Sequence, residues 1–573
     1  MNSSNGRFQH WFKSPTARAI LFWLIPALFL GYFFYQPLLA LFKLLISPEW
    51  GFNFSTLDLN KAWQTLWFTT AQAALSTLLT LVIGLPGAWL FARFSFKGKK
   101  ALKILTTLPF ILPTVVVAAG FNALLGPHGW VNLGLMTLLK LDSPPIHFLN
   151  TFGAILIAHV FYNTTIIIRV VSNAWAQQNI RIQQAAQVLG ANPWRTFREI
   201  TLPLLRPSIL AGTLLVFLFN FTSFGVVLML GGPQFATLEV EIYIQALHLL
   251  NLPLAGVLSL LQLGCTLLIT IAHGHLTSQQ KLIISPRSRA VSVREPRKGF
   301  EKFIVVLLII TLFSLLIAPL ASLALRSIVK LEPERGERGE VQRGLTFKYY
   351  RELGINRRGS LFYVPPISAV GNSFTFALIT IVIALILGIL VAYALLQQTP
   401  INKFLDPLLM LPLGASAITL GLGFIIVFNR PPISEINFPI IVPIAHSLIA
   451  LPFVVRTLSP ALQGIPNTLR NAARSLGASP LRVLMEIDLP LLSPAIIVSI
   501  IFALTISLGE FGASTFLTQP SYPTIPVAIY RYISQPGALN YGQALAMSTL
   551  LMLVCAGGIF VIEHIRTSNR DWL

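Results

Sequence analysis

The sequence contains 573 residues, of which 54% are hydrophobic and only 11% are charged, and its mean hydropathy is +0.73. Soluble domains carry about 25% charged residues, so this composition excludes a water-soluble enzyme or binding module. The formal net charge of +21 does not require a nucleic-acid partner, because basic residues gather in the loops on one side of a membrane protein. We therefore expect an all-α polytopic membrane protein that binds no nucleic acid.

Twelve apolar runs are long enough to cross the lipid bilayer as helices, which takes about 20 residues. In chain order, the first six lie near 19–45, 64–92, 104–125, 151–171, 208–231 and 254–273. The other six lie near 302–325, 372–396, 405–428, 438–456, 494–518 and 542–563. The first run is too long for a signal-peptide core and has no small-residue cleavage site after it, so we interpret it as a retained anchor.

Polar segments divide these runs into two modules, predicted at 1–277 and 302–573. The basic, polar segment 278–301 between them is interpreted as a cytoplasmic linker. The segment 326–371 is predicted to be an outer insertion of the second module. Its part 330–358 is charged and rich in glycine, and it is predicted to be flexible or only locally ordered.

The loop after the fourth run of each module is the same sequence in two copies. Residues 185–207 read AAQVLGANPWRTFREITLPLLRP and residues 472–494 read AARSLGASPLRVLMEIDLPLLSP, with 14 of 23 aligned pairs identical. The offset of 287 also matches His159 with His446, well outside the loop. Unrelated membrane helices do not share identities at one constant offset, so the protein consists of two copies of one six-span module.

The distribution of Lys and Arg predicts the orientation of the spans. With the N-terminus inside, the cytoplasmic segments hold 27 of the 41 basic residues. Nine of the other 14 lie in 326–371, and long translocated segments have little influence on orientation. Both termini and both copies of the repeated loop are therefore expected in the cytoplasm.

Each repeated loop is predicted to form two short helices separated by a sharp break. Gly190 and Gly477 suit the left-handed position just past a helix end. Asn192 and Ser479 each precede a proline, which is the pattern of an N-cap followed by proline at the first helical position. The Leu-Pro pair that follows in each loop is expected to end the second short helix before the next span begins. We call residues 184–207 the first elbow and residues 471–494 the second elbow.

An interfacial amphipathic linker and a DNA-reading helix-turn-helix are the alternative interpretations of the elbows. The flanking spans are too close in sequence to leave a free recognition helix. Two rigid elbows related by pseudo-symmetry suit docking onto a two-fold symmetric partner better than either alternative.

Both elbows resemble the EAA loop of type I ABC-importer permeases, whose pattern is E-A-A, then Gly, then I-x-L-P. The leading acid of that pattern is replaced by Gln184 and Asn471 in this sequence. In that family the loop forms the coupling helix that fits a cleft of a cytosolic ATPase. The resemblance thus implies an ATPase-coupling role for Gln184, Ala185, Ala186, Gly190, Ile200, Leu202, Pro203, Asn471, Ala472, Ala473, Gly477, Ile487, Leu489 and Pro490.

The resemblance covers nearly the whole chain and implies two fused permease domains in a bacterial-type inner membrane. Its implied partners are two cytosolic ABC ATPase subunits, an extracytoplasmic substrate-binding protein and the lipid bilayer, with no cofactor. The sequence contains no G-x-x-x-x-G-K-[ST] phosphate loop, so separate subunits have to hydrolyse ATP. Within the family, residues 221–247 and 507–533 resemble the thiamine and ferric-iron permeases, and the first stretch is closer to the thiamine members.

Glu510 is the only acidic residue that we place well inside a predicted span, and its repeat partner is Ser223. Because an intramembrane carboxylate is costly, it is a functional candidate by default. We expect Ser223 and Glu510 to line the translocation path, and a satisfied structural hydrogen bond is the alternative for Glu510. His159 and His446 are expected to be buried and hydrogen bonded rather than to bind a metal.

The remaining polar and reactive residues indicate no catalysis and no metal site. Arg169 and Arg456 match across the repeat, and each is interpreted either as an interfacial anchor or as a contact to its elbow. Cys265 and Cys555 lie inside predicted spans and are expected to be packing residues. No Ser-His-Asp or paired-carboxylate arrangement suggests chemistry on a substrate.

The predicted function is the permease subunit of an ATP-driven, binding-protein-dependent importer for thiamine or a related small cation. Ferric iron is the alternative cargo within the same family. A secondary transporter without partners is the alternative from another class. It would need several intramembrane charges for ion coupling, and it gives no reason for duplicated elbows.

Overall fold

The computed structural model describes residues 14–46, 58–280, 293–296, 299–331, 344–355, 364–429 and 439–568. These residues form helices almost throughout, and their only extended pairings are two isolated bridges, Phe94 with Arg294 and Val329 with Leu345. The prediction of an all-α membrane protein is therefore confirmed over the described part of the chain.

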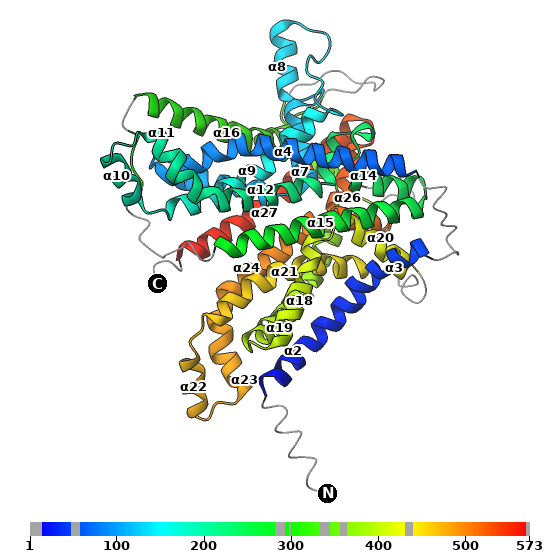
Figure 1. Cartoon of the computed structure of the whole chain (residues 1–573). Helices are drawn as coiled ribbons and strands as arrows, with labels where there is room; N and C mark the ends of the chain where they lie inside the picture. Colours follow the sequence, from blue (N-terminus) through cyan, green and yellow to red (C-terminus); the bar gives the residue numbers. More distant parts are fainter. Residues whose placement is uncertain are drawn as a thin grey trace.

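The first half contains long membrane helices separated by short helices and by π- or 3-10-helical turns, which are labelled η (Figure 1). Its elements are α2 (Pro15–Leu30), η1 (Gly31–Tyr35), α3 (Gln36–Ile46), α4 (Leu59–Arg93), α5 (Lys99–Leu105), α6 (Leu108–Ile111), α7 (Thr114–Leu125), α8 (Trp130–Leu139), α9 (Phe152–Ala176), α10 (Ile180–Val188), α11 (Pro193–Thr196), η4 (Phe197–Thr201), α12 (Leu202–Phe221), α13 (Gly225–Leu230), η5 (Pro233–Phe235), α14 (Leu238–Tyr243), η6 (Ile244–His248) and α15 (Leu252–Gln280).

The second half has fewer short elements between its long helices, and its outer insertion contributes one short helix, α17. Its elements are α16 (Gly299–Ser327), α17 (Lys348–Glu352), α18 (Pro366–Leu396), α19 (Pro400–Gly414), α20 (Ala417–Phe428), α21 (Ile441–Gln463), α22 (Asn467–Ser475), α23 (Pro480–Val483), η9 (Leu484–Asp488), α24 (Leu489–Gly509), α25 (Gly512–Leu517), α26 (Ile525–Ile533) and α27 (Ala538–Ser568).

Among the described residues, ten helices are long and apolar enough to cross a membrane, and an eleventh span results if the bent pair α19 and α20 counts as one. The expected span at 104–125 is instead three short helices, α5 to α7. Pro109 lies in the first turn of α6 and Pro113 directly precedes α7, so neither position can continue the preceding helix. The expected run at 405–428 bends by 99° after Gly414, where Ser416 caps α20.

The spans at 208–231 and 494–518 are also broken, and they break at the same repeat position. Helix α12 ends at Phe221 before α13 begins at Gly225, and α24 ends at Gly509 before α25 begins at Gly512. Irregular backbone at membrane depth is tolerated only where protein or a polar cavity satisfies it. The four breaks therefore mark the part of the fold in which a polar site can exist.

The first helix of each half packs on the other half. Helix α2 lies against α18 and α19, and α3 lies against α20, while α16 packs on α7 of the first half and on α27. The indole N–H of Trp23 on α2 donates to Asn402 Oδ1 on α19 at 2.8 Å, and this buried hydrogen bond holds α2 against the second half. The modules read from the sequence are thus interlocked in space.

Glycine allows the closest helix contacts inside each module. A Cβ atom at Gly84 would lie 2.7 Å from Ile167 Cβ, and one at Gly388 would lie 2.5 Å from Val454 Cγ1. Ile167 and Val454 are related by the repeat offset of 287. Each crossing, of α4 with α9 and of α18 with α21, therefore depends on one glycine that packs against the same repeat position of the partner helix.

The predicted linker and insertion are described only in part. Most of the linker lies outside the described residues, but Arg294 pairs with Phe94 through the backbone and with Glu301 through its guanidinium. In the insertion, α17 packs on α27, and the ring of Tyr349 fills the space above Gly542. The segments 332–343 and 356–358, on which the prediction of local order also rested, lie outside the described residues.

Candidate functional site

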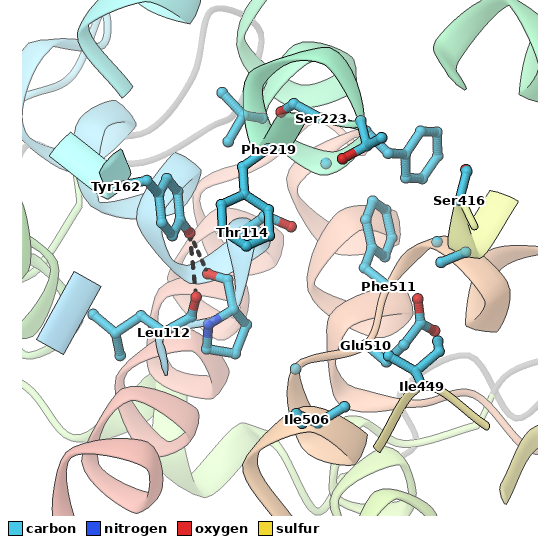
Figure 2. A pocket seen from close by; sticks show the side chains of 18 of the residues that line it. Leu112, Thr114, Tyr162, Phe219, Ser223, Ser416, Ile449, Ile506, Glu510 and Phe511 are labelled. Carbon is cyan, nitrogen blue, oxygen red and sulfur yellow. Dashed lines mark hydrogen bonds between the residues drawn. The ribbon is translucent and has the colours of Figure 1, made fainter. Parts of the chain in front are cut away.

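A cavity of about 420 Å³ lies where the broken helices of the two halves meet (Figure 2). The first half contributes residues from α6, α7, α9, α12, α13 and α14, and the second contributes residues from α19, α20, α21, α24 and α25. Its walls are mostly apolar. The polar side chains on them are Thr114, His159, Tyr162, Asn163, Thr222, Ser223, Glu239, Ser416, Thr505 and Glu510.

The two repeat-related histidines are buried and hydrogen bonded, as predicted. His159 accepts or donates at both ring nitrogens, with Gln72 Nε2 2.7 Å from Nδ1 and Ser223 Oγ 2.8 Å from Nε2. For His446, the hydroxyl oxygen of Ser507 lies 2.9 Å from Nδ1, and that of Ser514 lies 2.9 Å from Nε2. Each imidazole thus ties the fourth span of its module to the break that follows the fifth.

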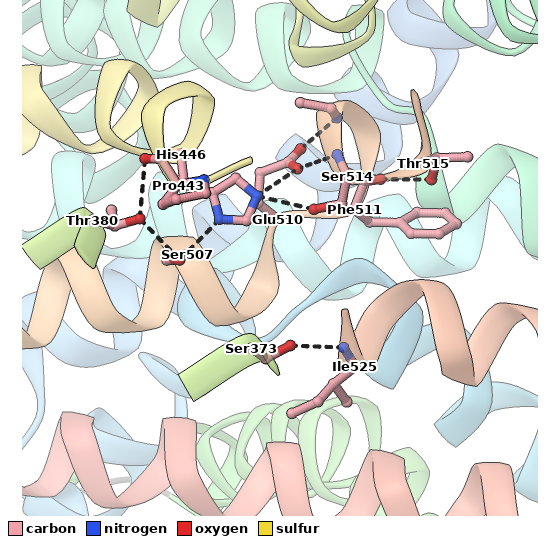
Figure 3. A network of polar contacts seen from close by, with 11 residues as sticks. Ser373, Thr380, Pro443, His446, Ser507, Glu510, Phe511, Ser514, Thr515 and Ile525 are labelled. Atoms are coloured by element: carbon pink, nitrogen blue, oxygen red, sulfur yellow. Dashed lines mark hydrogen bonds and ion pairs between the residues drawn. The ribbon is translucent and has the colours of Figure 1, made fainter. Parts of the chain in front are cut away.

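Glu510 lies at the break between α24 and α25, which corrects its predicted position well inside a span (Figure 3). Its two carboxylate oxygens accept hydrogen bonds from the backbone N–H groups of Ala513 at 2.9 Å and Ser514 at 2.8 Å. His446 Nε2 lies 3.4 Å from Oε2. The carboxylate therefore caps α25, and because Glu510 also lines the cavity, its role in translocation stays a prediction.

Ser223 occupies the equivalent break in the first half and lines the same cavity. The structure thus brings together the two side chains that the sequence paired only by their offset. Where the second half has a His446–Glu510 contact, the first half has a His159–Ser223 hydrogen bond. The cavity is consequently asymmetric in charge although its backbone is repeated.

Sequence reasoning missed a second buried acid in this cavity, Glu239 on α14. Its side chain is 2% exposed, and its Oε1 accepts a hydrogen bond from Gln262 Nε2 at 2.7 Å. Ser416, from the second half, lines the same cavity. The neighbouring Glu241 forms an ion pair with Lys61 at 2.6 Å.

Glu239 was missed because residues 232–251 resemble an ordinary loop between two spans. In the structure this stretch folds back among the helices as η5, α14 and η6. One signal was available, since Tyr243 and four other residues of this stretch recur at the offset of 287 in the second module. Residues that stay identical between the two modules beyond the end of a span indicate that the segment packs within the fold.

Aromatic rings from both halves stack beside the carboxylates. The rings of Phe224 and Phe511 lie 5.3 Å apart, centroid to centroid, across the module interface. Tyr243 lies 5.4 Å from Phe224, and Tyr530 lies 5.6 Å from Phe511. Both pairs are related by the repeat, so the cluster is pseudo-symmetric. Phe224 and Phe511 also line the cavity.

Both elbows adopt the break predicted for them. Gly190 has φ +88° and Gly477 has φ +83°, in the left-handed region. Asn192 Oδ1 accepts a hydrogen bond from the N–H of Arg195 at 2.7 Å, and Ser479 Oγ accepts from that of Arg482 at 3.3 Å. Proline follows each of these caps as the first residue of α11 or α23. The sequence therefore predicted the local geometry of both turns.

The prediction that a Leu-Pro pair ends the second elbow helix is wrong. Helix α11 continues through η4 into α12, and α23 continues through η9 into α24. In the intervening π-helical turn the N–H of Leu202 binds Phe197 O, and that of Leu489 binds Leu484 O. The wider turn accommodates the proline that follows, which would otherwise clash with a carbonyl of the preceding turn.

The elbows present apolar side chains to the surface at matched positions. Leu189 and its repeat partner Leu476 are each 88% exposed, and Trp194 and its partner Leu481 are also exposed. Among the residues that the resemblance assigned to ATPase coupling, those exposed are Gln184, Ala185, Gly190, Pro203, Asn471, Ala472, Gly477 and Pro490. The half-buried ones are Ala186, Ile200, Leu202, Ala473, Ile487 and Leu489.

The repeated arginines bind the broken third span of their own module. Arg169 donates to Thr107 Oγ1 at 2.5 Å, between α5 and α6. Arg456 lies 3.8 Å from Asp406 Oδ2 on α19. Of the two cysteines, Cys555 is buried and Cys265 is half-buried. Within the described ranges, no group of three His, Cys, Asp or Glu side chains could hold a metal ion.

Comparison with known proteins is consistent with this architecture. The sequence pattern of the family described as "Binding-protein-dependent transport system inner membrane component" matches residues 84–280 and 384–568, which together are more than half of the chain. Each matched segment contains one elbow and two of the four helix breaks that line the cavity.

Individual relatives align over most of the chain. The thiamine transport system permease protein of Haemophilus influenzae is 27% identical over 87% of both chains. A probable ABC transporter permease protein of Sinorhizobium fredii is 26% identical over 88% of this chain and 87% of its own. Among solved structures, a bacterial ABC transporter that imports the acidic polysaccharide alginate is 20% identical, with a TM-score of 0.37, over 46% of this chain and 96% of its own.

Proposed function

Because the chain belongs to the family of binding-protein-dependent transport system inner membrane components, we propose that its two modules form the pathway of an ATP-driven importer. The elbows dock on two separate cytosolic ATPase subunits, and a binding protein delivers the cargo on the other side. Both termini then lie in the cytoplasm of a bacterial-type inner membrane. The observation that carries this proposal is the pair of matched elbows, each continuous with a span that ends at the cavity.

Exposed apolar residues on the elbows support docking onto a protein. Leu189 and Leu476 are exposed at equivalent turns of the two elbows, and Figure 1 shows the elbow helices α10 and α22 well apart. Exposed apolar residues at rigid, repeated positions are typical of an interface with another protein. Two related elbows match two copies of one partner, as a pair of identical ATPase subunits would provide.

The continuous helices give the elbows a mechanical connection to the cavity. The spans Pro193–Phe221 and Pro480–Gly509 have 29 and 30 residues, about 44 Å at 1.5 Å per residue. Each begins in an elbow and ends next to Ser223 or Glu510. A rigid-body movement of an elbow, driven by ATPase closure, is therefore transmitted along the helix to the cavity wall.

The aromatic cluster is the barrier that this movement has to open. The rings of Phe224 and Phe511 meet at the interface of the two halves, so separation of the halves separates the rings. A polar solute cannot cross a closed apolar constriction without losing its hydration. Opening and closing this contact therefore alternates access to the cavity.

The cavity chemistry suits a small organic cation such as thiamine. Glu239 and Glu510 supply two carboxylates, and neighbouring aromatic rings supply faces that attract a cation. Thiamine carries a positively charged thiazolium ring. Ferric iron remains the alternative cargo, and the experiment below separates the two.

The test is transport in proteoliposomes that contain this chain, its ATPase subunits and the binding protein. We expect uptake and ATP hydrolysis to rise when the binding protein carries thiamine, and to stay at the basal level when it is unloaded. Stimulation by a ferric complex instead would identify the alternative cargo. Uptake that requires an ion gradient and no ATPase would contradict the proposed mechanism.

A further inference from the structure

A second cavity, of about 430 Å³, lies at the base of the first elbow. Its walls are the end of α4, the end of α9, the helices of the first elbow and Arg294 from the linker. Aromatic side chains form one part of the wall and polar side chains of α10 form another. This volume is within the range of small-molecule sites, which is about 300–1,000 Å³.

Arg93, at the end of α4, places a half-buried positive charge on this wall. Its guanidinium donates to Gln183 Oε1, and no described carboxylate forms an ion pair with it. The neighbouring Arg294 already binds Glu301 through two hydrogen bonds of 2.9 and 2.6 Å, which raise the pKa of Arg294. The linker sequences 281–292 and 297–298 contain no Asp or Glu that could neutralise Arg93.

The wall also contains a buried donor without an acceptor. Trp175 is 8% exposed, and its indole N–H has no hydrogen-bond partner among the described residues. A buried donor left unpaired is costly, so such groups usually bind a ligand or an ordered water molecule. At the same cavity, the Trp175 N–H therefore lacks an acceptor and Arg93 lacks a counter-charge among the described residues.

The second module shows what fills the equivalent place. There, Arg470 Nε donates to Asp488 Oδ1 at 2.8 Å, and the hydroxyl of Tyr393 on α18 donates to Asp488 Oδ2 at 2.6 Å. Arg470 and Asp488 are both buried. This carboxylate connects the second elbow to α18, the counterpart of α4.

The first module lacks this carboxylate. At the offset of 287, Gln183 stands where Arg470 stands, and Thr201 stands where Asp488 stands. The cation of the first module comes instead from Arg93, and the anion is absent from the chain's described residues there. The cavity lies beside Thr201 and Gln183, which line it.

We propose that the cavity at the first elbow binds a small phosphate-bearing anion, which completes the ion pair that Asp488 completes in the second module. The phosphate group accepts from Arg93 and the Trp175 N–H, since a guanidinium fork suits phosphate oxygens. The aromatic wall holds the organic part. Bound anion connects the first elbow to α4 and stiffens it. The phosphate belongs either to a soluble ester or to a phospholipid headgroup.

The test is isothermal titration calorimetry of the purified full-length chain in detergent, with glycerol 3-phosphate as the probe and sodium chloride of equal ionic strength as the blank. Arg93→Gln removes the charge, and Thr201→Asp supplies a carboxylate from the protein itself. Arg195→Gln is the matched control, because Arg195 lies on the same elbow but is exposed and paired with Glu199. Binding is measured without transport, so the result does not depend on the proposed cargo.

We expect saturable binding by the natural chain and by Arg195→Gln, and binding at least about tenfold weaker in Arg93→Gln and in Thr201→Asp. Nanodiscs distinguish the two sources. If phosphatidylglycerol suppresses the glycerol 3-phosphate signal and phosphatidylcholine does not, a lipid headgroup is the occupant; an equal signal in both indicates a soluble ester. Equal binding by Arg93→Gln, or no saturable binding in detergent and in either nanodisc, would overturn the proposal.

Discussion

Replacing Gly477 tests whether the shape of the second elbow is needed for coupling. The N–H of Gly477 binds Arg474 O at 3.0 Å, and that of Ala478 binds Ala473 O at 3.0 Å. This pair of bonds ends α22 and requires the glycine to adopt φ +83°. A Cβ atom at this position would meet no other atom within 4 Å. Any effect within the chain therefore comes from the backbone conformation and not from a steric clash.

The expected magnitude follows from the cost of the left-handed conformation. An L-residue other than Gly, Asn or Asp loses about 1–2 kcal/mol there, and a β-branched side chain is the least tolerated. Gly477→Val should thus lower the population of the native turn by up to roughly 30-fold. Asn enters this region far more readily, so Gly477→Asn should retain most of the native turn. The pair of variants separates backbone conformation from the presence of a side chain.

The assay is binding-protein-stimulated ATP hydrolysis in proteoliposomes, with membrane insertion checked by the yield of purified protein. We expect Gly477→Val to insert normally and to lose most of the stimulated activity, while Gly477→Asn stays close to the natural chain. Normal stimulation in the Val variant would refute the reasoning. Equal loss in both variants would also refute it, because a contact of the side chain with the ATPase would then be the cause.

Three further predictions concern the cavity, the orientation and the elbow core. Glu239→Gln and Glu510→Gln should each lower uptake of a cationic cargo strongly at unchanged basal ATP hydrolysis, and full uptake in both would show that the two carboxylates are structural only. With the native cysteines removed, an impermeant thiol reagent added outside should label Ser143→Cys but not Ser479→Cys, and the reverse pattern would invert the topology. Asp488→Asn leaves a buried arginine without its counter-charge and should lower the free energy of unfolding by about 3–5 kcal/mol, measured as a lower Tm, so an unchanged Tm would contradict the buried ion pair.

Local features of the elbows could be predicted from the sequence because they depend on single residues. A glycine past a helix end and an N-cap followed by proline each have one conformation that satisfies the backbone. Gly190 and Asn192 therefore specified their turn without tertiary information, and the repeat confirmed the pattern at Gly477 and Ser479. The helix that follows could not be predicted in the same way, because a π-helical turn relieves the proline that was expected to end it.

Hydropathy predicted where the chain is buried but not where its helices break. The run at 494–518 is apolar enough for one span, yet it ends at Gly509, because the Glu510 carboxylate caps a new helix. Glu239 was missed for the opposite reason. It lies in a stretch too short for a span, and packing against α15 and α20 places that stretch among the membrane-spanning helices. Both errors occur at the cavity. There, tertiary hydrogen bonds satisfy buried polar groups, whereas hydropathy alone predicts that such groups are not buried.

The fusion of two modules in one chain has a physical consequence for this cavity. Glu239 has Pro526 as its repeat partner, and Glu510 has Ser223, so each half contributes one acid at a non-equivalent position. Two identical modules would place four carboxylates around a cavity of about 420 Å³, and their mutual repulsion at low dielectric would be costly. A single chain can keep the aromatic barrier symmetric while it limits the buried charge to two. For the proposed cationic cargo, two carboxylates whose charge the surrounding hydrogen bonds disperse would attract the cation, whereas four would hold it too tightly to release.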